Sequence, residues 1–343
     1  MKPSPGHSIR RTLVAIFFAL VVLFVIVPVI YEWSGVRQNL EEQFAPIAPT
    51  IVARIIRKRP VAPPTPIAIQ VIPVRPRNTP TPLPPPPDGI NGVPIQRIVF
   101  LSVSTREHIR DIYALGQSLG RNPRSVSKVG DSTMVYPPFL ATFDAKTYRL
   151  GRFAYLQPTI DFAAGSFGRI SAAVKKGMHT WSQFDPSWVA LNSCGPDEGP
   201  LACEIRQHNP SIAIIRLGAN DSDVPGEFER NLVSIVKFCL ARGIIPVLGT
   251  KPDHHEGQSN LINNVIRKTA SAYRIPLWDY DLVAGTVPGR GLEPDLLHIR
   301  WSGTRDFQSP AAMRAGDALE DLTALMMLHT IRQEVGADLV LSK

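Results

Sequence analysis

A proline-rich segment divides the chain and restricts what each part can fold into. Fifteen of the 33 prolines lie between Pro46 and Pro94, and residues 84–87 are four consecutive prolines. Proline lacks a backbone N–H and fixes φ, so this segment cannot form a helix or a central strand. The composition predicts an extended, fairly stiff linker over residues 34–95. An exposed spacer is the simpler interpretation, and a proline-motif ligand for another protein is the alternative.

An uncharged run before the linker is long enough to cross a bilayer. Residues 13–31 carry no charge, and as a helix they would span about 29 Å. Basic residues precede the run and mainly acidic residues follow it. This asymmetry predicts a cytoplasmic N-terminus at residues 1–11, a single transmembrane helix at residues 12–33 and cell-membrane localisation, with the remainder extracytoplasmic. A cleaved signal peptide is the alternative, but no small-residue cleavage site follows the run.

Beyond the linker, apolar strands alternate with amphipathic helices, which predicts one domain over residues 96–343. Alternation of this kind is typical of a mostly parallel sheet with helices on both faces. Functional residues in such sheets lie at the carboxyl ends of the strands. Strands are expected at residues 97–102, 126–129, 212–217, 244–248 and 275–278, and helices at residues 105–119, 227–242, 260–273 and 310–334.

The positive charge of the chain is concentrated before this domain. The formal net charge is +8, and residues 1–95 hold ten of the 37 Lys and Arg but only four of the 29 Asp and Glu. The domain itself is therefore close to neutral. A nucleic-acid-binding domain would carry a clustered basic face, so the charge distribution argues against nucleic acid as a partner.

Three short motifs, far apart in the chain, hold the residue types of a hydrolytic site. They are Gly130-Asp131-Ser132, Gly218-Ala219-Asn220-Asp221 and Asp295-Leu296-Leu297-His298. A serine hydroxyl becomes a good nucleophile when a base takes its proton. A histidine does so well when a carboxylate orients its ring, and the oxyanion formed on attack needs fixed donors. Each of the first two motifs follows a predicted strand.

In block order and spacing, these motifs resemble the SGNH or GDSL hydrolase family over roughly residues 96–335. The resemblance implies a three-layer α/β/α, flavodoxin-like fold with a mostly parallel sheet. It implies a catalytic triad of Ser132, Asp295 and His298, and an oxyanion hole formed by Ser132, Gly168 and Asn220. Gly165 is an alternative to Gly168, because the family's second block is the least clear here. Asp131 and Asp221 are expected to support the two site loops.

The predicted activity is that of an extracytoplasmic serine esterase acting on short-chain carboxylic esters, such as O-acetyl groups, through an acyl-enzyme. The expected substrate is an ester on an acylated glycan, and no cofactor or metal is needed. A silent carbohydrate-binding or scaffold module and a glycan O-acyltransferase are the alternatives. The sequence does not indicate an oligomeric state.

The domain also holds cysteines and a His-rich motif, residue types that form disulfides or bind metals. Cys194 and Cys203 flank a short polar loop, and an exported domain favours a disulfide between them over two buried thiols. Cys239 lies in an apolar helical stretch and is expected in the core.

Asp253-His254-His255-Glu256 has ligand-type side chains, but adjacent residues rarely converge on one ion, so no metal site is predicted. Trp301, three residues after His298, is the tryptophan expected near the site.

Overall fold

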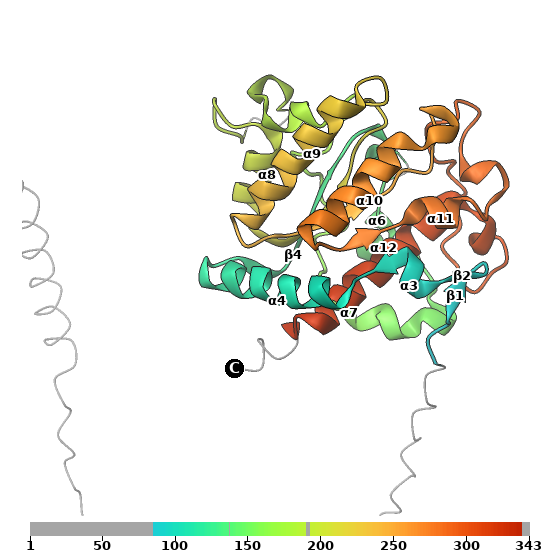
Figure 1. Cartoon of the computed structure of the whole chain (residues 1–343). Coiled ribbons are helices and arrows are strands. Elements are labelled where there is room, and N and C mark those ends of the chain that lie inside the picture. The colour runs from blue at the N-terminus through green and yellow to red at the C-terminus, as the bar shows by residue number, and fades with distance from the viewer. Residues whose placement is uncertain (1–84, 137, 190–192, 338–343) are drawn as a thin grey trace, which may run out of the picture. The chain divides into compact units, whose positions relative to one another are not determined.

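The computed structural model describes residues 85–136, 138–189 and 193–337. The predicted transmembrane helix and most of the predicted linker lie outside these residues. Within the described ranges, no helix combines the length and the apolar character needed to cross a membrane. The fold is α/β and is built on a five-stranded, mostly parallel sheet with the order β3-β7-β6-β5-β4 (Figure 1).

The four strands from β4 to β7 run parallel, and β3 pairs with β7 in the antiparallel direction. Strands β5 and β6 are mostly apolar, as expected for strands buried on both faces, whereas β4 is largely polar in sequence although residues 125–130 are buried. In β5, Ile212 and Ile214 face one core, while Ala213 and Ile215 face the other. The strands are β3 (Val99–Phe100), β4 (Asn122–Gly130), β5 (Pro210–Arg216), β6 (Ile245–Gly249) and β7 (Leu277–Trp278).

Helices cover both faces of this sheet (Figure 1). One core is formed with α8 (Pro200–His208), α9 (Pro225–Leu240) and α10 (Leu261–Tyr273), whose apolar stripes pack on the sheet. The other core is formed mainly with α4 (Val103–Ser118) and α12 (Gly316–Glu334). Most of α12 is buried, because it lies between the sheet and the shorter helices α7 (Gln157–Phe162) and α11 (Tyr280–Ala284).

The folded domain begins earlier than the predicted boundary at residue 96. Strands β1 (Gly89–Ile90) and β2 (Val93–Pro94) form a small antiparallel pair. Ile90 is fully buried in the larger core, and the Asn91 side chain donates to the carbonyl oxygen of Met313. The end of the predicted linker is thus part of the domain, because one large apolar residue among the prolines packs into the core.

The strand predicted at residues 97–102 is mostly wrong. Those residues contribute the end of a short helix, α3 (Ile95–Ile98), and then only the two-residue strand β3. Ile98 is buried, but Phe100 is 45% exposed. A short edge strand with one exposed aromatic residue does not have the regular alternation on which the prediction depended.

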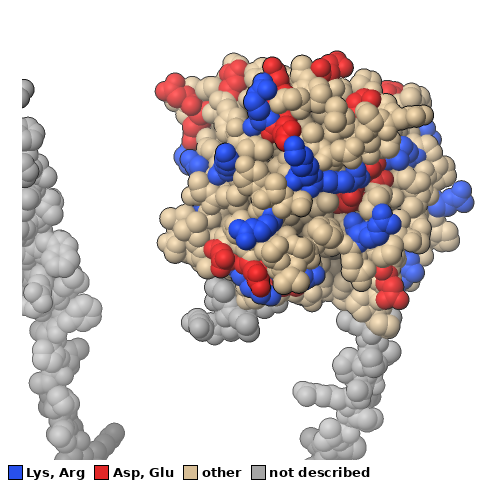
Figure 2. Space-filling model, in the orientation of Figure 1, with Lys and Arg blue, Asp and Glu red and all other residues tan. Residues whose placement is uncertain are grey.

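The charges on the domain surface are mixed in sign. On the face drawn in Figure 2, Lys and Arg side chains are interspersed with Asp and Glu, and neither sign forms a continuous patch. Some exposed charges of the domain are paired, such as Lys268 with Glu229. This face therefore lacks the clustered basic surface that nucleic-acid binding requires.

Candidate active site

The proposed nucleophile lies in a tight turn after β4. Helix α5 (Ser132–Val135) begins at Ser132, and Asp131 caps it by accepting hydrogen bonds from the Thr133 N–H (2.9 Å) and hydroxyl (2.7 Å). Burial raises the pKa of the Asp131 carboxyl above its usual range, while these hydrogen bonds oppose the shift. A side chain at Gly130 would collide with Met134, so glycine allows the chain to turn directly into α5.

His298 and Asp295 form a paired unit within one loop. His298 Nδ1 lies 2.7 Å from Asp295 Oδ2, and Asp295 Oδ1 accepts the backbone N–H groups of Leu297 and His298, both at 3.0 Å. These hydrogen bonds, led by that from the imidazole, lower the pKa of Asp295 to about 2. The carboxylate is therefore ionised at neutral pH and orients the imidazole ring.

The two loops meet although they are distant in sequence. His298 Nε2 lies 3.0 Å from Ser132 Oγ, which is within reach for proton transfer. With the Nδ1 proton donated to Asp295, the other ring nitrogen has a lone pair directed at the serine hydroxyl. The structure thus brings together Ser132, His298 and Asp295 in the relative positions of a nucleophile, a base and an orienting acid.

The motif after β5 brings an amide to the same place. Asn220 lines the cavity that contains Ser132, and its Nδ2 donates to the carbonyl oxygen of Met178 at 2.9 Å. Asp221 accepts hydrogen bonds from the Thr180 N–H and hydroxyl. Burial raises the pKa of Asp221, and the Thr180 hydrogen bonds oppose the rise. Together these contacts join the loop after β5 to the segment at residues 178–180.

The predicted second-block glycine, Gly168, is not at the site. Its N–H donates to Asp144 Oδ2 at 2.7 Å, and the N–H of the alternative, Gly165, donates to Asp144 Oδ1 at 2.8 Å. The glycine that lines the cavity beside Ser132 is Gly177, in the left-handed region with φ +78°. The segment before Gly177 pairs with the edge of β4 through a single bridge, Gly130 to Val174. This pairing is too short to be predicted as a strand, so Gly177 was not identified as the residue that follows one.

A sequence signal for Gly177 exists but is short. Residues 171–174 read Ser-Ala-Ala-Val, and Gly177 follows three residues later. One serine followed by three small apolar residues is a weak strand signal. The pairing becomes evident only in the structure, where Gly130 N donates to the carbonyl oxygen of Ala173.

The site opens into a cavity of about 420 Å³. Its walls come from the turn after β4, the segment around residue 177 and the loops after β5 and before His298. The lining residues are Ser132, Tyr136, Lys176, Gly177, Asn220, Leu297 and His298. A larger hollow of about 670 Å³, beside Phe143 and Asp144, contains none of the proposed catalytic residues.

Three side chains of the motif at residues 253–256 pair with other charged groups. Lys251 Nζ contacts the carboxylates of Asp253 (2.6 Å) and Glu256 (2.5 Å), and His254 Nε2 lies 2.8 Å from Asp281. Trp301 is 47% exposed and lies under the guanidinium of Arg305 rather than lining the cavity.

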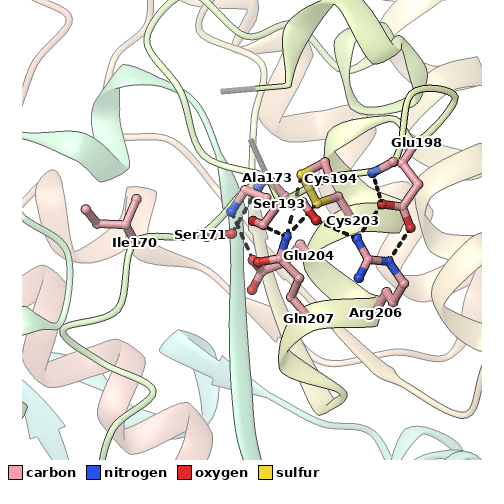
Figure 3. Close-up of a disulfide and its surroundings, with 12 residues drawn as sticks. Ile170, Ser171, Ala173, Ser193, Cys194, Glu198, Cys203, Glu204, Arg206 and Gln207 are labelled. Carbon is pink, nitrogen blue, oxygen red and sulfur yellow. Dashed lines mark hydrogen bonds and ion pairs between the residues drawn. A yellow bond between two sulfur atoms is a disulfide. The ribbon is translucent and has the colours of Figure 1, made fainter. Parts of the chain in front are cut away.

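Cys194 and Cys203 form a disulfide, as predicted, and Cys239 is a buried free thiol (Figure 3). Figure 3 shows that the bridge joins the loop at Ser193 to α8, where Arg206 pairs with Glu198. Cys194, Cys203 and Glu198 are the one group of possible metal ligands within the described ranges. Disulfide sulfurs are not thiolates, so this group does not fit a metal.

No family model and no curated protein sequence matches the chain. Solved structures that align with it include TesA, with 18% identity, coverage of 60% of this chain and 99% of that one, and a TM-score of 0.40. The psychrotrophic esterase EstA from Pseudoalteromonas sp. aligns with 16% identity, 59% and 98% coverage and a TM-score of 0.36. An acetyl xylan esterase from Geobacillus stearothermophilus aligns with 16% identity, 60% and 94% coverage and a TM-score of 0.38. Similarity of this degree carries no inference about function, which depends on the geometry of the site residues.

Proposed function

We propose that this protein is a serine hydrolase of carboxylic esters, with Ser132, His298 and Asp295 as its catalytic triad. The observation that carries the proposal is the 3.0 Å separation between His298 Nε2 and Ser132 Oγ, with Asp295 bound to the other ring nitrogen. A turn serine without a catalytic role does not need an oriented imidazole at its hydroxyl. The resemblance of the three motifs to the SGNH family is consistent with this assignment.

In the proposed reaction, Ser132 Oγ attacks the ester carbonyl carbon while His298 Nε2 takes its proton. The carbonyl oxygen becomes an oxyanion, which accepts hydrogen bonds from the Asn220 amide and from the N–H groups of Gly177 and Ser132. When the tetrahedral species collapses, the C–O bond to the alcohol breaks and His298 protonates the departing oxygen. Water then repeats the sequence on the acyl-enzyme, which releases the carboxylic acid and restores Ser132.

The cavity favours a short acyl group. Of the seven residues that line it, only Leu297 has an aliphatic side chain. Each methylene of a long acyl chain contributes about 0.8 kcal/mol when it is buried against apolar surface, and a single aliphatic side chain does not enclose such a chain. We therefore propose acetyl or similarly short acyl groups, carried on a glycan.

The proposed location is outside the cytoplasm, with attachment to the cell membrane through residues 12–33. The cystine at Cys194 and Cys203 is consistent with an oxidising compartment, and the uncharged run and its flanking charges supply the anchor. Protease treatment of intact cells tests the topology directly. The proposed arrangement predicts that external protease removes the domain and leaves a short N-terminal fragment.

The activity is tested with the full chain and a series of aryl esters from acetyl to decanoyl. We expect the highest kcat/KM for the acetyl ester and a steady fall with chain length. Ser132→Ala and His298→Ala should each reduce turnover to near background. Equal turnover by Ser132→Ala and the unmodified protein would contradict the assignment of the nucleophile.

A further inference from the structure

Three of the residues that line the catalytic cavity have no part in the proposed chemistry. Ser132, Gly177, Asn220 and His298 supply the nucleophile, the donors and the base, which leaves Tyr136, Lys176 and Leu297. Side chains that face bound substrate without taking part in bond making determine which substrate fits. These three residues therefore indicate the chemistry of the molecule that carries the ester.

Lys176 gives the cavity a positive charge without a counter-ion. Its side chain is exposed at the cavity wall and makes no hydrogen bond or ion pair with any residue of the described ranges. The carboxylates of the two site loops do not pair with Lys176: Asp221 accepts a hydrogen bond from Thr180, and Asp295 lies against His298. An unneutralised cation beside a reaction site attracts substrates that carry negative charge.

Aromatic side chains lie at this cavity and behind its wall at Gly177. Tyr136, directly after α5, lines the cavity and is 53% exposed. A Cβ placed on Gly177 would lie 3.9 Å from the Trp188 ring. Trp188 contacts Trp181 edge to face, with ring centroids 5.7 Å apart, and Trp181 is 41% exposed. The aromatic surface is thus continuous with the cavity wall at Gly177.

We propose that Lys176, Tyr136 and Trp181 bind an acidic glycan, so that the substrate is an O-acylated polysaccharide with carboxylated sugar rings. The inference rests on the proposed esterase function and specifies its substrate class. Tyr136 and Trp181 stack on the apolar faces of sugar rings, and Lys176 pairs with a ring carboxylate near the ester. Rigid aromatic side chains supply contact area with little loss of conformational freedom.

An anionic lipid fits this surface less well. A lipid ester would place acyl chains at the site, and Leu297 is the one aliphatic side chain among the described residues that line the cavity. The exposed groups around the cavity are instead flat rings and a cation. Such surfaces suit a ligand whose rings have apolar faces and charged or hydroxylated edges.

The test compares two acetylated oligosaccharides of equal length, an oligogalacturonide and a neutral xylo-oligosaccharide, as substrates of the full chain. We expect kcat/KM to be about threefold to fivefold higher for the acidic substrate, and this preference to diminish with added salt. Lys176→Gln should bring the ratio close to one, and Lys176→Glu should reverse it. Lys237→Gln, which removes an exposed lysine on α9, should leave the ratio unchanged.

The aromatic part of the subsite is tested by Tyr136→Ala and Trp181→Ala. Each should raise KM for both oligosaccharides by about tenfold, with little change in kcat. Trp301→Ala is the control, because Trp301 is similarly exposed but packs under Arg305 rather than against Trp188. Equal losses in all three variants would overturn the stacking role.

A binding measurement separates the inference from the proposed activity. Titration of the full-length Ser132→Ala variant with de-acetylated oligogalacturonide should show binding that Lys176→Gln weakens. If aryl acetate is hydrolysed but the acidic and neutral glycans bind and react equally, the acidic-glycan inference is wrong and the esterase proposal stands. If the protein hydrolyses no ester but binds oligogalacturonide through Lys176, the esterase proposal fails and the binding site remains.

Discussion

Arg216 Nη2 donates a 2.7 Å hydrogen bond to the carbonyl oxygen of Thr133, the residue that follows the proposed nucleophile. Arg216 is the last residue of β5, and the loop that carries Asn220 begins just after it. Its guanidinium is buried, pairs with Glu320 of α12 and lies against the rings of Phe139 and Trp278. The nucleophile turn and the loop bearing the proposed oxyanion donor are therefore held by one buried side chain.

This arrangement predicts that substituting Arg216 alone destabilises the protein more than substituting Arg216 and Glu320 together. Arg216→Met should lower the free energy of unfolding by about 3–5 kcal/mol, because it leaves the Glu320 carboxylate buried without its partner. The double variant Arg216→Met with Glu320→Leu should recover most of that loss. Chemical denaturation measures both, and strictly additive losses would mean that the two side chains are not coupled.

Asn220→Ala should reduce kcat on an aryl acetate by about 10²- to 10³-fold with a much smaller change in KM, because the amide acts mainly on the oxyanion. The comparison is with Asn264→Ala, an asparagine on the exposed part of α10 whose amide donates only to a nearby carbonyl oxygen. A change confined to KM would instead assign Asn220 to substrate binding.

Substitution distinguishes Gly177 from Gly168 as the glycine that donates to the oxyanion. Gly177→Ala should lower kcat by about tenfold or more, because alanine is strained at φ +78° and the shifted loop misdirects an oxyanion donor. Gly168→Ala should keep kcat within about twofold, since the Gly168 N–H serves only the Asp144 carboxylate among described residues. The reverse pattern in steady-state kinetics would restore Gly168 as the second-block residue.

The buried ammonium group of Lys128 makes the free energy of unfolding depend on pH. Its ammonium donates to the carbonyl oxygens of Phe139 and Phe167. Burial, with a smaller effect of the Arg169 charge, lowers its pKa from 10.5 to about 8. Between these two pH values the unfolded chain binds the proton and the folded protein does not, so stability rises with pH across that window.

Over this pH window, Lys128 increases the free energy of unfolding by roughly 3 kcal/mol. We expect Lys128→Met to remove it, so that the difference in unfolding free energy between the variant and the parent changes between pH 8 and pH 10.5. Lys237→Met is the matched control on the surface. A constant difference across this range would show that Lys128 keeps an ordinary pKa in the folded protein.

The central part of the fold was predictable because its signals are local and strong. Strands β5 and β6 are mostly apolar runs, β4 carries Val126 and Val129 directly before its site loop, and α9 and α10 have apolar residues at helical spacing. The short length and antiparallel direction of β3, the early start at Ile90 and helix α8 were missed. In each case a few residues take their structure from tertiary packing rather than from their own pattern.

The site was predictable where residue type and spacing fix the geometry. Asp295 and His298 share one turn, so their pairing follows from the sequence, and Ser132 and Asn220 each follow a strand that ends at the same edge of the sheet. Gly177 was missed because its role depends on one bridge beside β4. The pairing of Arg216 with Glu320 was missed for a similar reason, since nothing local marks a buried ion pair between distant elements.

Labelling with a fluorophosphonate, followed by peptide mapping, tests the catalytic assignment most directly. We expect one modified residue, Ser132, and we expect labelling to be lost in His298→Ala and slowed in Asp295→Asn. A folded protein that turns over aryl acetate while the probe modifies a different serine, or while Ser132→Ala retains full activity, would contradict it.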